Sequence, residues 1–173
     1  KNMKALDWSR FSDILIEDEY GDIRPMSEPY FKVKKIAEGT WQVLSDGDYS
    51  YVIEGSDEAI VIDSGMGAVN IRAYCQTLTD KPIYRMLLTH CHFDHTANCY
   101  LFDCVYMSKE SYARRNEPMG EFLERGMQFP DDYPVVFIKE GDVIDLGNRK
   151  LEVYNIAEHA LGSLQFLDRS TRI

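Results

Sequence analysis

The sequence predicts an α/β protein built on a mixed β-sheet. Two strand-like stretches, residues 41–44 and 49–54, flank the turn-forming residues 45–48, which is the pattern of a β-hairpin. Residues 59–62 form a continuous apolar run, which suits a strand covered on both faces. Apolar residues then recur at helical spacing, so we expect a helix over residues 67–79. Runs of strands with intervening helices predict packed layers of helix and sheet.

The rest of the chain continues this alternation. A buried strand is expected over residues 83–88. Residues 108–132 are expected to be helical but irregular, because prolines and glycines interrupt them. Their aromatic and methionine side chains suit either a lid or pocket wall, or ordinary packing of surface helices. Further strands are predicted at residues 104–107, 135–138, 150–156 and 163–167.

The composition is that of one globular domain. The chain has 173 residues, of which 45% are hydrophobic and 28% charged. Its net charge of −10 repels phosphate backbones, so we expect no nucleic-acid partner. The sequence contains four cysteines without a C-x-x-C pair, no signal-peptide pattern and no apolar run of membrane-spanning length. We therefore expect a cytoplasmic protein without a membrane partner.

Three of the four histidines lie within six consecutive residues, in the pattern His90-x-His92-x-Asp94-His95. This concentration indicates a metal site, because imidazole and carboxylate are ordinary ligands for Zn, Fe and Mn. In extended chain after a strand, His90 and His92 share one face and Cys91 points away. Asp94 stands where the N-cap of a following helix is expected, so it and His95 would face the same cavity. The alternative, a loop with surface histidines, is disfavoured by the position between a strand and a helix.

This histidine motif resembles the signature of the metallo-β-lactamase-fold hydrolases. Residues 60–65 (Ile-Val-Ile-Asp-Ser-Gly) are similar to the strand and turn that precede the signature in that family. Residues 158–163 (Glu-His-Ala-Leu-Gly-Ser) resemble the later segment that carries the family's third metal-binding histidine. The resemblance covers residues 33–173 and implies an αββα sandwich. It leaves residues 1–32 as an N-terminal extension.

The resemblance also implies a set of metal ligands. The first metal would be held by His90, His92 and His159, with one position open for water. Asp94 and His95 would begin a second metal site. The expected cofactor is one or two zinc ions, with iron or manganese as alternatives.

The implied activity is metal-dependent hydrolysis of a small-molecule substrate. A metal with three protein ligands generates hydroxide at neutral pH, and this hydroxide would attack an ester, thioester, lactone or lactam. Asp94 would be catalytic, holding and orienting the nucleophile as well as coordinating the metal. Asp63 is expected behind the ligands, orienting one of them or the motif loop. Its alternative role is that of an ordinary turn residue.

The sequence departs from the family pattern at two places. Glu158 and Ala160 replace the glycine and threonine that flank the third histidine in the family. In the family, a bridging aspartate and a final histidine follow the third metal-binding histidine. No residue of this sequence matches either of them, and Asp168 comes too early for the bridging role. We therefore expect a fold that is incomplete at the C-terminus, with the apolar faces of residues 59–62 and 83–88 exposed. A homo-oligomer or a complementary C-terminal segment would then cover them.

Two other functions share parts of this pattern. A mono-iron persulfide dioxygenase has the same fold and histidines but leaves the second-site residues unused. A non-catalytic fragment that needs a complementary chain would turn nothing over. Metal content and turnover distinguish these alternatives from a hydrolase.

Overall fold

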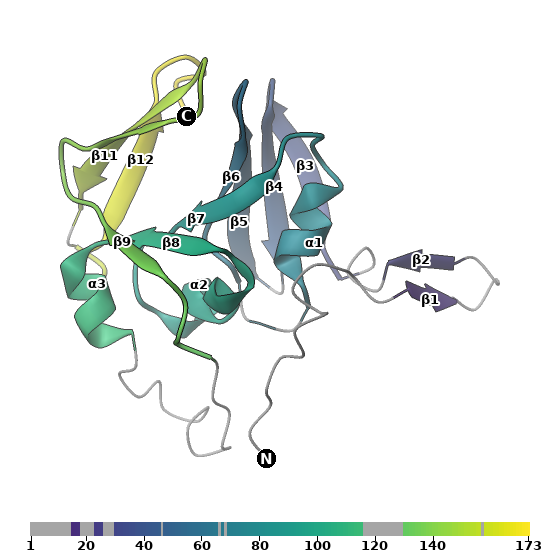
Figure 1. The fold of residues 1–173 in the computed structure, drawn as a ribbon, viewed down its shortest axis with the longest axis horizontal. Coiled ribbons are helices and arrows are strands. Elements are labelled where there is room, and N and C mark those ends of the chain that lie inside the picture. Colours follow the sequence, from purple (N-terminus) through teal and green to yellow (C-terminus); the bar gives the residue numbers. More distant parts are fainter. Residues whose placement is uncertain are drawn as a thin grey trace.

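The computed structural model describes residues 15–17, 23–25, 30–45, 47–65, 67, 69–115, 130–156 and 158–173. Its strands form a seven-stranded sheet, a three-stranded sheet and a separate two-stranded ribbon (Figure 1). The ribbon pairs β1 (Leu15–Glu17) with β2 (Ile23–Pro25) in antiparallel register. Most of the expected N-terminal extension, residues 1–32, lies outside the described residues, so its separation from the domain stays a prediction.

The larger sheet has the strand order β3-β4-β5-β6-β7-β8-β9. Its strands are β3 (Lys32–Ala37), β4 (Thr40–Ser45), β5 (Asp48–Glu54), β6 (Ala59–Ile62), β7 (Ile83–Leu87), β8 (Cys104–Met107) and β9 (Val135–Phe137). Strands β3 to β6 pair antiparallel through short turns. Strands β6 to β9 run parallel, because longer connections return the chain to the same end of the sheet. The predictions of a mixed sheet and of the β4–β5 hairpin are confirmed.

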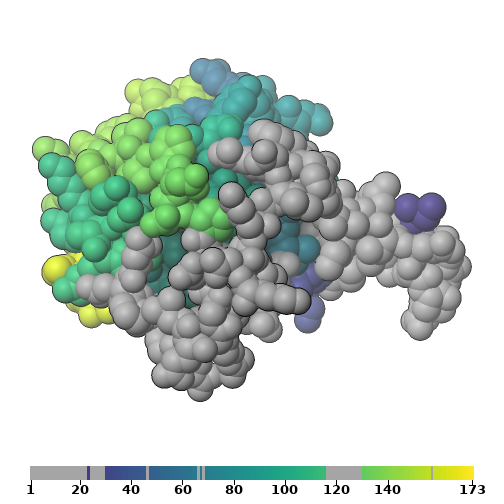
Figure 2. Space-filling model, turned by 60° about the horizontal axis from the view of Figure 1, so that its bottom comes forward, coloured from purple at the N-terminus to yellow at the C-terminus, as the bar shows by residue number. Residues whose placement is uncertain are grey.

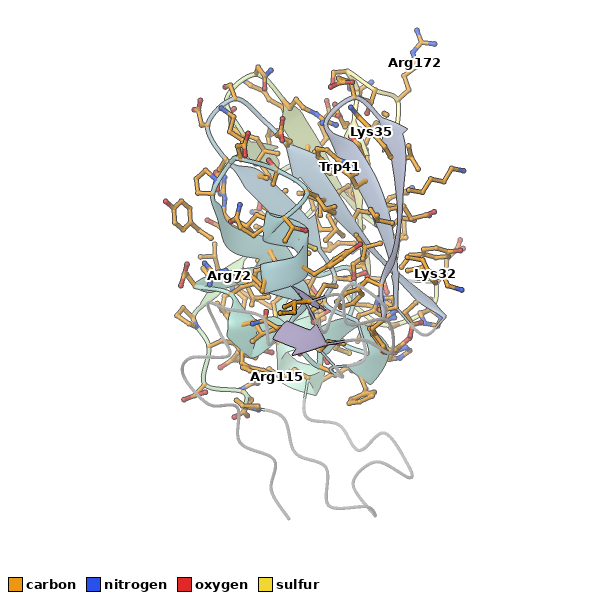
Figure 3. The ribbon with its side chains drawn as sticks, turned by 90° about the vertical axis from the view of Figure 1, so that its right-hand side faces the viewer. Lys32, Lys35, Trp41, Arg72, Arg115 and Arg172 are labelled. Atoms are coloured by element: carbon orange, nitrogen blue, oxygen red, sulfur yellow. The ribbon has the colours of Figure 1, made fainter. Side chains whose placement is uncertain are left out.

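The strand β3 forms one edge of this sheet. Its exposed residues include Lys32, Lys34 and Lys35. Lys35 pairs with Trp41 on β4, and its ammonium nitrogen lies 5.8 Å from the centre of the indole ring (Figure 3). Charged lysines on an edge strand discourage the pairing of another strand, so this edge is protected against association.

The helices are short and connect the parallel strands. They are α1 (Ile71–Gln76), α2 (Phe93–Thr96), the 3-10 helix η2 (Cys99–Leu101) and α3 (Lys109–Arg114). The side chain of Asn70 caps α1 by accepting a hydrogen bond from the amide of Ala73 at 3.0 Å. Arg72 of α1 donates to the carbonyls of Ile83 and Leu101, which ties the helix to β7 and η2 (Figure 3). The helix predicted over residues 67–79 is therefore present but shorter.

The region after β8 begins with α3, whose first turn is capped by Ser108. In the space-filling view, the surface coloured teal to light green, where α3 and β9 belong in the sequence colouring, is continuous (Figure 2). Residues 116–129 lie outside the described residues, so the expectation of a lid or pocket wall there stays untested. Within the part of the chain that the structure describes, no helix is long and apolar enough to cross a bilayer.

The smaller sheet lies against the larger one and completes a sandwich (Figure 1). It contains β10 (Val143–Asp145), β11 (Lys150–Asn155) and β12 (Leu164–Asp168), all antiparallel. The strand β10 was not predicted from the sequence, whereas β11 and β12 were. Residues Leu146, Leu151 and Val153 pack on Ile60 and Leu87 of the larger sheet. On the opposite face of the larger sheet, α1 contributes to a second apolar cluster, so the described layers follow the order helix, sheet, sheet.

The apolar strands in the middle of the larger sheet are covered, which corrects the expectation that they would be exposed. All four residues of β6 are buried. Ala59 and Val61 point into the cluster beneath α1, whereas Ile60 and Ile62 point toward the smaller sheet. The smaller sheet therefore covers the face that was expected to remain open. Each fully buried aliphatic side chain stabilises the fold by about 1.5–3 kcal/mol.

Arg149 joins the two sheets through charge-assisted hydrogen bonds. Its side chain is 7% exposed and its Nε donates to Asp168 Oδ2 at 2.9 Å. The guanidinium also donates to Thr40 Oγ1 at 2.8 Å and to the carbonyls of Gly39 and Glu54 at 2.8 and 3.1 Å. Asp168 is thus the partner of a buried arginine, in agreement with its exclusion from the bridging role.

Candidate metal centre

The site lies where β6 and β7 end, at the same edge of the sheet. These strands are parallel, so the residues that follow them come close together although they are far apart in the sequence. Asp63 follows β6, and its amide donates to the carbonyl of Leu87 at the end of β7, at 2.9 Å. The backbone of Asp63 has a φ of +60°, a left-handed conformation that aspartate tolerates better than most residues. With this backbone conformation, the Asp63 carboxylate points toward the histidine motif, where it contacts Thr89 and His95.

The motif itself corrects the expected local geometry. His90 and His92 lie in a loop after β7 rather than in extended strand. The carbonyl of His92 accepts from the amides of His95 and Thr96, so the helix α2 is capped by His92. Asp94 consequently lies inside the first turn and is not the N-cap. Ser64 holds this turn in place, because its hydroxyl donates to the carbonyl of His95 at 2.8 Å.

A chain of hydrogen bonds sets the proton positions on two histidines. Asp63 Oδ2 lies 2.8 Å from His95 Nδ1 and 2.7 Å from the hydroxyl of Thr89. The carboxylate only accepts, so His95 Nδ1 and the Thr89 hydroxyl both donate to it. The Thr89 oxygen, 2.9 Å from His90 Nδ1, is then left to accept from that nitrogen. In the neutral rings, Nε2 of both His90 and His95 therefore carries a lone pair.

Three histidines converge from two distant parts of the chain. His92 Nδ1 and His159 Nε2 lie 3.1 Å apart, and the ring of His90 is centred 4.6 and 4.8 Å from theirs. One nitrogen from each ring falls within 4.8 Å of the others. His90 is buried, and its Nε2 has no hydrogen-bond partner among the described residues. Burial and the neighbouring histidines lower the pKa of His90, whereas Asp63 raises it. The net effect is a pKa of about 4. The ring is therefore neutral at pH 7, which is the form that binds metals.

His159 reaches the site from the loop between β11 and β12. This loop is fastened to the motif by a hydrogen bond from the amide of Leu164 to the carbonyl of Thr89, at 2.8 Å. The carbonyl of Gly162 accepts from the hydroxyls of Ser108 and Ser111, which anchors the loop to α3. The smaller sheet therefore positions the third histidine of the group.

A second group lies beside the first. It contains Asp48, Asp94 and His95, whose nearest ligand atoms are all within 4.8 Å of one another. His95 Nε2 is 3.2 Å from Asp94 Oδ2. Burial acts to lower the pKa of His95, but the hydrogen bond and charge of Asp63, with Asp94 and Asp48, raise it above its ordinary value. Cys91 belongs to neither group of ligand atoms among the described residues.

Asp48 was missed by the sequence reasoning, which treated residues 45–48 only as a hairpin turn. No spacing signal connects Asp48 with a motif more than forty residues downstream. The other site residues proposed from the sequence, His90, His92, Asp94 and His95, lie together with Asp48 at this edge of the sheet. Their roles as ligands stay a proposal.

A family model described as the metallo-beta-lactamase superfamily matches residues 46–173, which is most of the chain. The chain belongs to this superfamily. Among solved structures, the native FEZ-1 metallo-beta-lactamase of Legionella gormanii is similar with a TM-score of 0.66 and 22% identity, over 80% of this chain and 58% of that chain. The subclass B3 enzyme BJP-1 of Bradyrhizobium japonicum has a TM-score of 0.63 and 20% identity, over 80% of this chain and 56% of that chain. At such identities the structures show a shared fold.

Two relatives in sequence are named acyl-coenzyme A thioesterase MBLAC2, from Bos taurus and Homo sapiens. Each is 28% identical over 152 residues, covering 71% of this chain and 54% of the relative. The chain thus spans about half the length of the curated relatives it matches.

The metallo-beta-lactamase fold generally binds metal ions, and the residues present here fit one. Two ligands of a tetrahedral zinc at 2.0–2.1 Å lie about 3.3 Å apart, close to the 3.1 Å between His92 Nδ1 and His159 Nε2. Among the described residues, Nε2 of His90 has no hydrogen-bond partner, and a metal ion would replace the hydrogen bonds to water that this buried nitrogen has lost.

Proposed function

We propose that this chain carries the metal centre of a metal-dependent hydrolase that cleaves acyl thioesters. The observation that carries the proposal is the convergence of the three histidine nitrogens. One of them, Nε2 of His90, is buried and has no hydrogen-bond partner in the part of the chain that the structure describes. The choice of a thioester over an ester, lactone or lactam rests on the relatives that are named acyl-coenzyme A thioesterases. Both the activity and the substrate belong to the whole protein and are proposals for this chain.

The residues divide into two ligand groups with separate tasks. His90, His92 and His159 would hold the first metal, and Asp94 and His95 would take part in the second. Zinc held by these residues would supply a Lewis acid for the carbonyl oxygen of the substrate and would lower the pKa of water. The side chain of Asp94 is one-third exposed at the centre, so water can reach its carboxylate. Asp94 would accept the proton of the attacking water on a carboxylate oxygen.

The chemistry of a thioester suits this set of residues. The leaving group is a thiol, and thiols are far more acidic than alcohols, with a pKa of about 8.5 for the cysteine side chain. It can therefore depart as a thiolate without a general acid to protonate it. The protein then has to position the carbonyl group and remove one proton from water. The carboxylate of Asp94 beside His95 can perform that proton transfer.

The second ligand group favours a two-metal hydrolase over the mono-iron dioxygenase. A dioxygenase with one iron would leave Asp94 and His95 without a function. Here Asp63 orients His95, and His95 Nε2 faces Asp94. Such orientation of a ligand by a neighbouring carboxylate is typical of residues that bind metals.

The test uses the full natural polypeptide that carries residues 1–173. Its metal content is measured, and turnover is followed with an acyl-coenzyme A thioester, an aryl ester, a chromogenic cephalosporin and a phosphodiester. We expect turnover of the thioester that is lost with a chelator and restored by zinc. His159→Ala should abolish it, whereas the exposed Asp80→Asn should keep it.

Four outcomes contradict the proposal. Thioester turnover that persists after metal removal would exclude metal dependence. Preference for the cephalosporin or the phosphodiester would reject the substrate class. A single iron per chain with oxygen consumption on a persulfide would favour the dioxygenase, and a protein that turns over none of the substrates would favour the non-catalytic fragment.

A further inference from the structure

We propose that Asp48, from the β4–β5 hairpin, is a direct ligand of the second metal together with Asp94 and His95. The inference rests on the proposed metal centre and adds a ligand that the histidine motif does not contain. The family pattern takes its bridging carboxylate from the chain beyond His159, whereas Asp48 precedes the motif.

The topology explains how Asp48 reaches the centre. Asp48 is the first residue of β5 and pairs with Ser45 across the hairpin. Strand β5 lies next to β6 in antiparallel register, with Tyr51 opposite Ile62, so the start of β5 extends beyond the end of β6. This is the edge of the sheet where Asp63 and the motif lie. The hairpin therefore brings a carboxylate to the site from the side opposite β7.

Gly65 permits this close approach. Its φ is +66°, and a side chain there would place a Cβ 2.6 Å from Ser45 Oγ. The hairpin that carries Asp48 is therefore seated against the turn that follows Asp63. A side chain at this position would be strained by the positive φ and would require the Ser45 hydroxyl to move.

The charges of the group point to a cation. The carboxylates of Asp48 and Asp94 both lie within 4.8 Å of the nearest ring nitrogen of His95 and of each other. Two like charges at this separation repel, and a divalent cation between them replaces that repulsion with attraction. Carboxylate oxygens with one imidazole form a donor set that suits zinc and manganese.

The first ligand group lies directly beside this one. His90 is 7% exposed, its Nε2 has no hydrogen-bond partner among the described residues, and its ring is centred 4.1 Å from the ring of His95. A metal held by the first group would account for this nitrogen. The group that contains Asp48 therefore lies next to the proposed position of the first metal.

The test measures metal binding rather than turnover. Asp48→Asn and Asp48→Ser are made in the full natural polypeptide, because both residues are well tolerated in turns. Asp80→Asn, in an exposed turn outside the site, is the matched control, and His95→Ala is the reference for a lost second-site ligand. Zinc stoichiometry is determined by mass spectrometry of the metal, and the affinity of each zinc equivalent by competition with a chromogenic chelator.

We expect both Asp48 variants to bind the first zinc as the control does and the second at least about tenfold more weakly. A second-site affinity equal to that of Asp80→Asn in either variant would overturn the inference, and so would a native protein that binds only one zinc. Weakened second-site binding in a protein without thioesterase activity would support Asp48 while rejecting the proposed substrate. The two proposals therefore fail separately.

Discussion

Asp63 Oδ2 lies 2.8 Å from His95 Nδ1, although the two residues are 32 positions apart in the sequence. The same carboxylate accepts from the backbone amide and the hydroxyl of Thr89, which in turn contacts His90. One buried residue behind the centre thus orients a histidine of each ligand group. We infer that Asp63 acts as a positioning residue for both.

The first prediction concerns Asp63→Asn. Asparagine tolerates the left-handed backbone at this position, so the turn should be retained. Both Thr89 and His95 donate to Oδ2 of Asp63, and an amide nitrogen at that position accepts no hydrogen bond. The rings of His90 and His95 should therefore lose their fixed orientation. We expect zinc affinity to fall about 10–100-fold, measured by chelator competition. Affinity within experimental error of the Asp80→Asn control would show that Asp63 is only a turn residue.

The second prediction tests whether zinc binding depends on the hydroxyl group of Thr89 or on the branched shape of its side chain. Thr89→Val keeps the branched side chain but leaves His90 Nδ1 without its acceptor and Asp63 without one donor. We expect about tenfold weaker binding of the first zinc. Thr89→Ser keeps the hydroxyl and should bind zinc as the native protein does. Equal affinities in the two variants would contradict the proton arrangement derived for His90.

The third prediction compares neighbours in the motif. His92→Ala removes a nitrogen that faces His159 and should abolish binding of the first zinc. Cys91→Ser should keep both metals, because the buried Cys91 lies in neither ligand group. Metal analysis of the purified variants checks this difference. Loss of metal from both variants would identify Cys91 as a ligand.

The fourth prediction concerns Gly162 in the loop that carries His159. Its φ is +81°, and a Cβ would lie 2.5 Å from Glu110 Cβ and from Ser108 Oγ. Gly162→Ala should therefore displace the loop from α3, lowering the affinity for the first zinc and destabilising the protein by about 1–3 kcal/mol. Thermal unfolding and zinc titration measure the two effects. Gly141→Ala has a similar φ of +89° but open space around its Cβ, so it should leave zinc binding unchanged.

The fifth prediction is a pH dependence of stability from the Arg149–Asp168 pair. Burial acts to raise the pKa of Asp168, but hydrogen bonds from Ser170 and Arg149 outweigh it and lower the pKa from 3.8 to about 2. The carboxylate therefore stabilises the folded state above pH 3.8, and this contribution is lost as the pH falls toward about 2. It corresponds to about 2 kcal/mol.

Asp168→Asn provides the measurement for this pair. Urea unfolding should show the variant to be less stable than the native protein at neutral pH, because a buried guanidinium is left without its counter-charge. The difference should shrink as the pH is lowered toward the pKa of the native Asp168. A constant difference across this range would show that the pair is not linked to proton binding.

Local patterns in the sequence were enough to predict features that depend on neighbouring residues. The β4–β5 hairpin and the apolar strand β6 follow from local spacing, and each is found where it was expected. The histidine motif lies between a strand and a helix as expected, but His92 rather than Asp94 caps that helix. The pairing of the motif with the distant His159 was predicted only through the family resemblance. Spacing alone carries no information about which loops meet at the edge of a sheet.

Two features depend on contacts between distant parts of the chain: the burial of β6 and the approach of Asp48 to Asp94 and His95. The smaller sheet buries Ile60 and Ile62, because Arg149 and the apolar residues around it fasten that sheet across the larger one. Asp48 approaches Asp94 and His95 because β5 is hydrogen-bonded to β6, whose parallel pairing with β7 brings the hairpin, Asp63 and the motif to one edge. Such contacts join residues that are far apart in the chain, and strand order, which no local pattern specifies, brings them together.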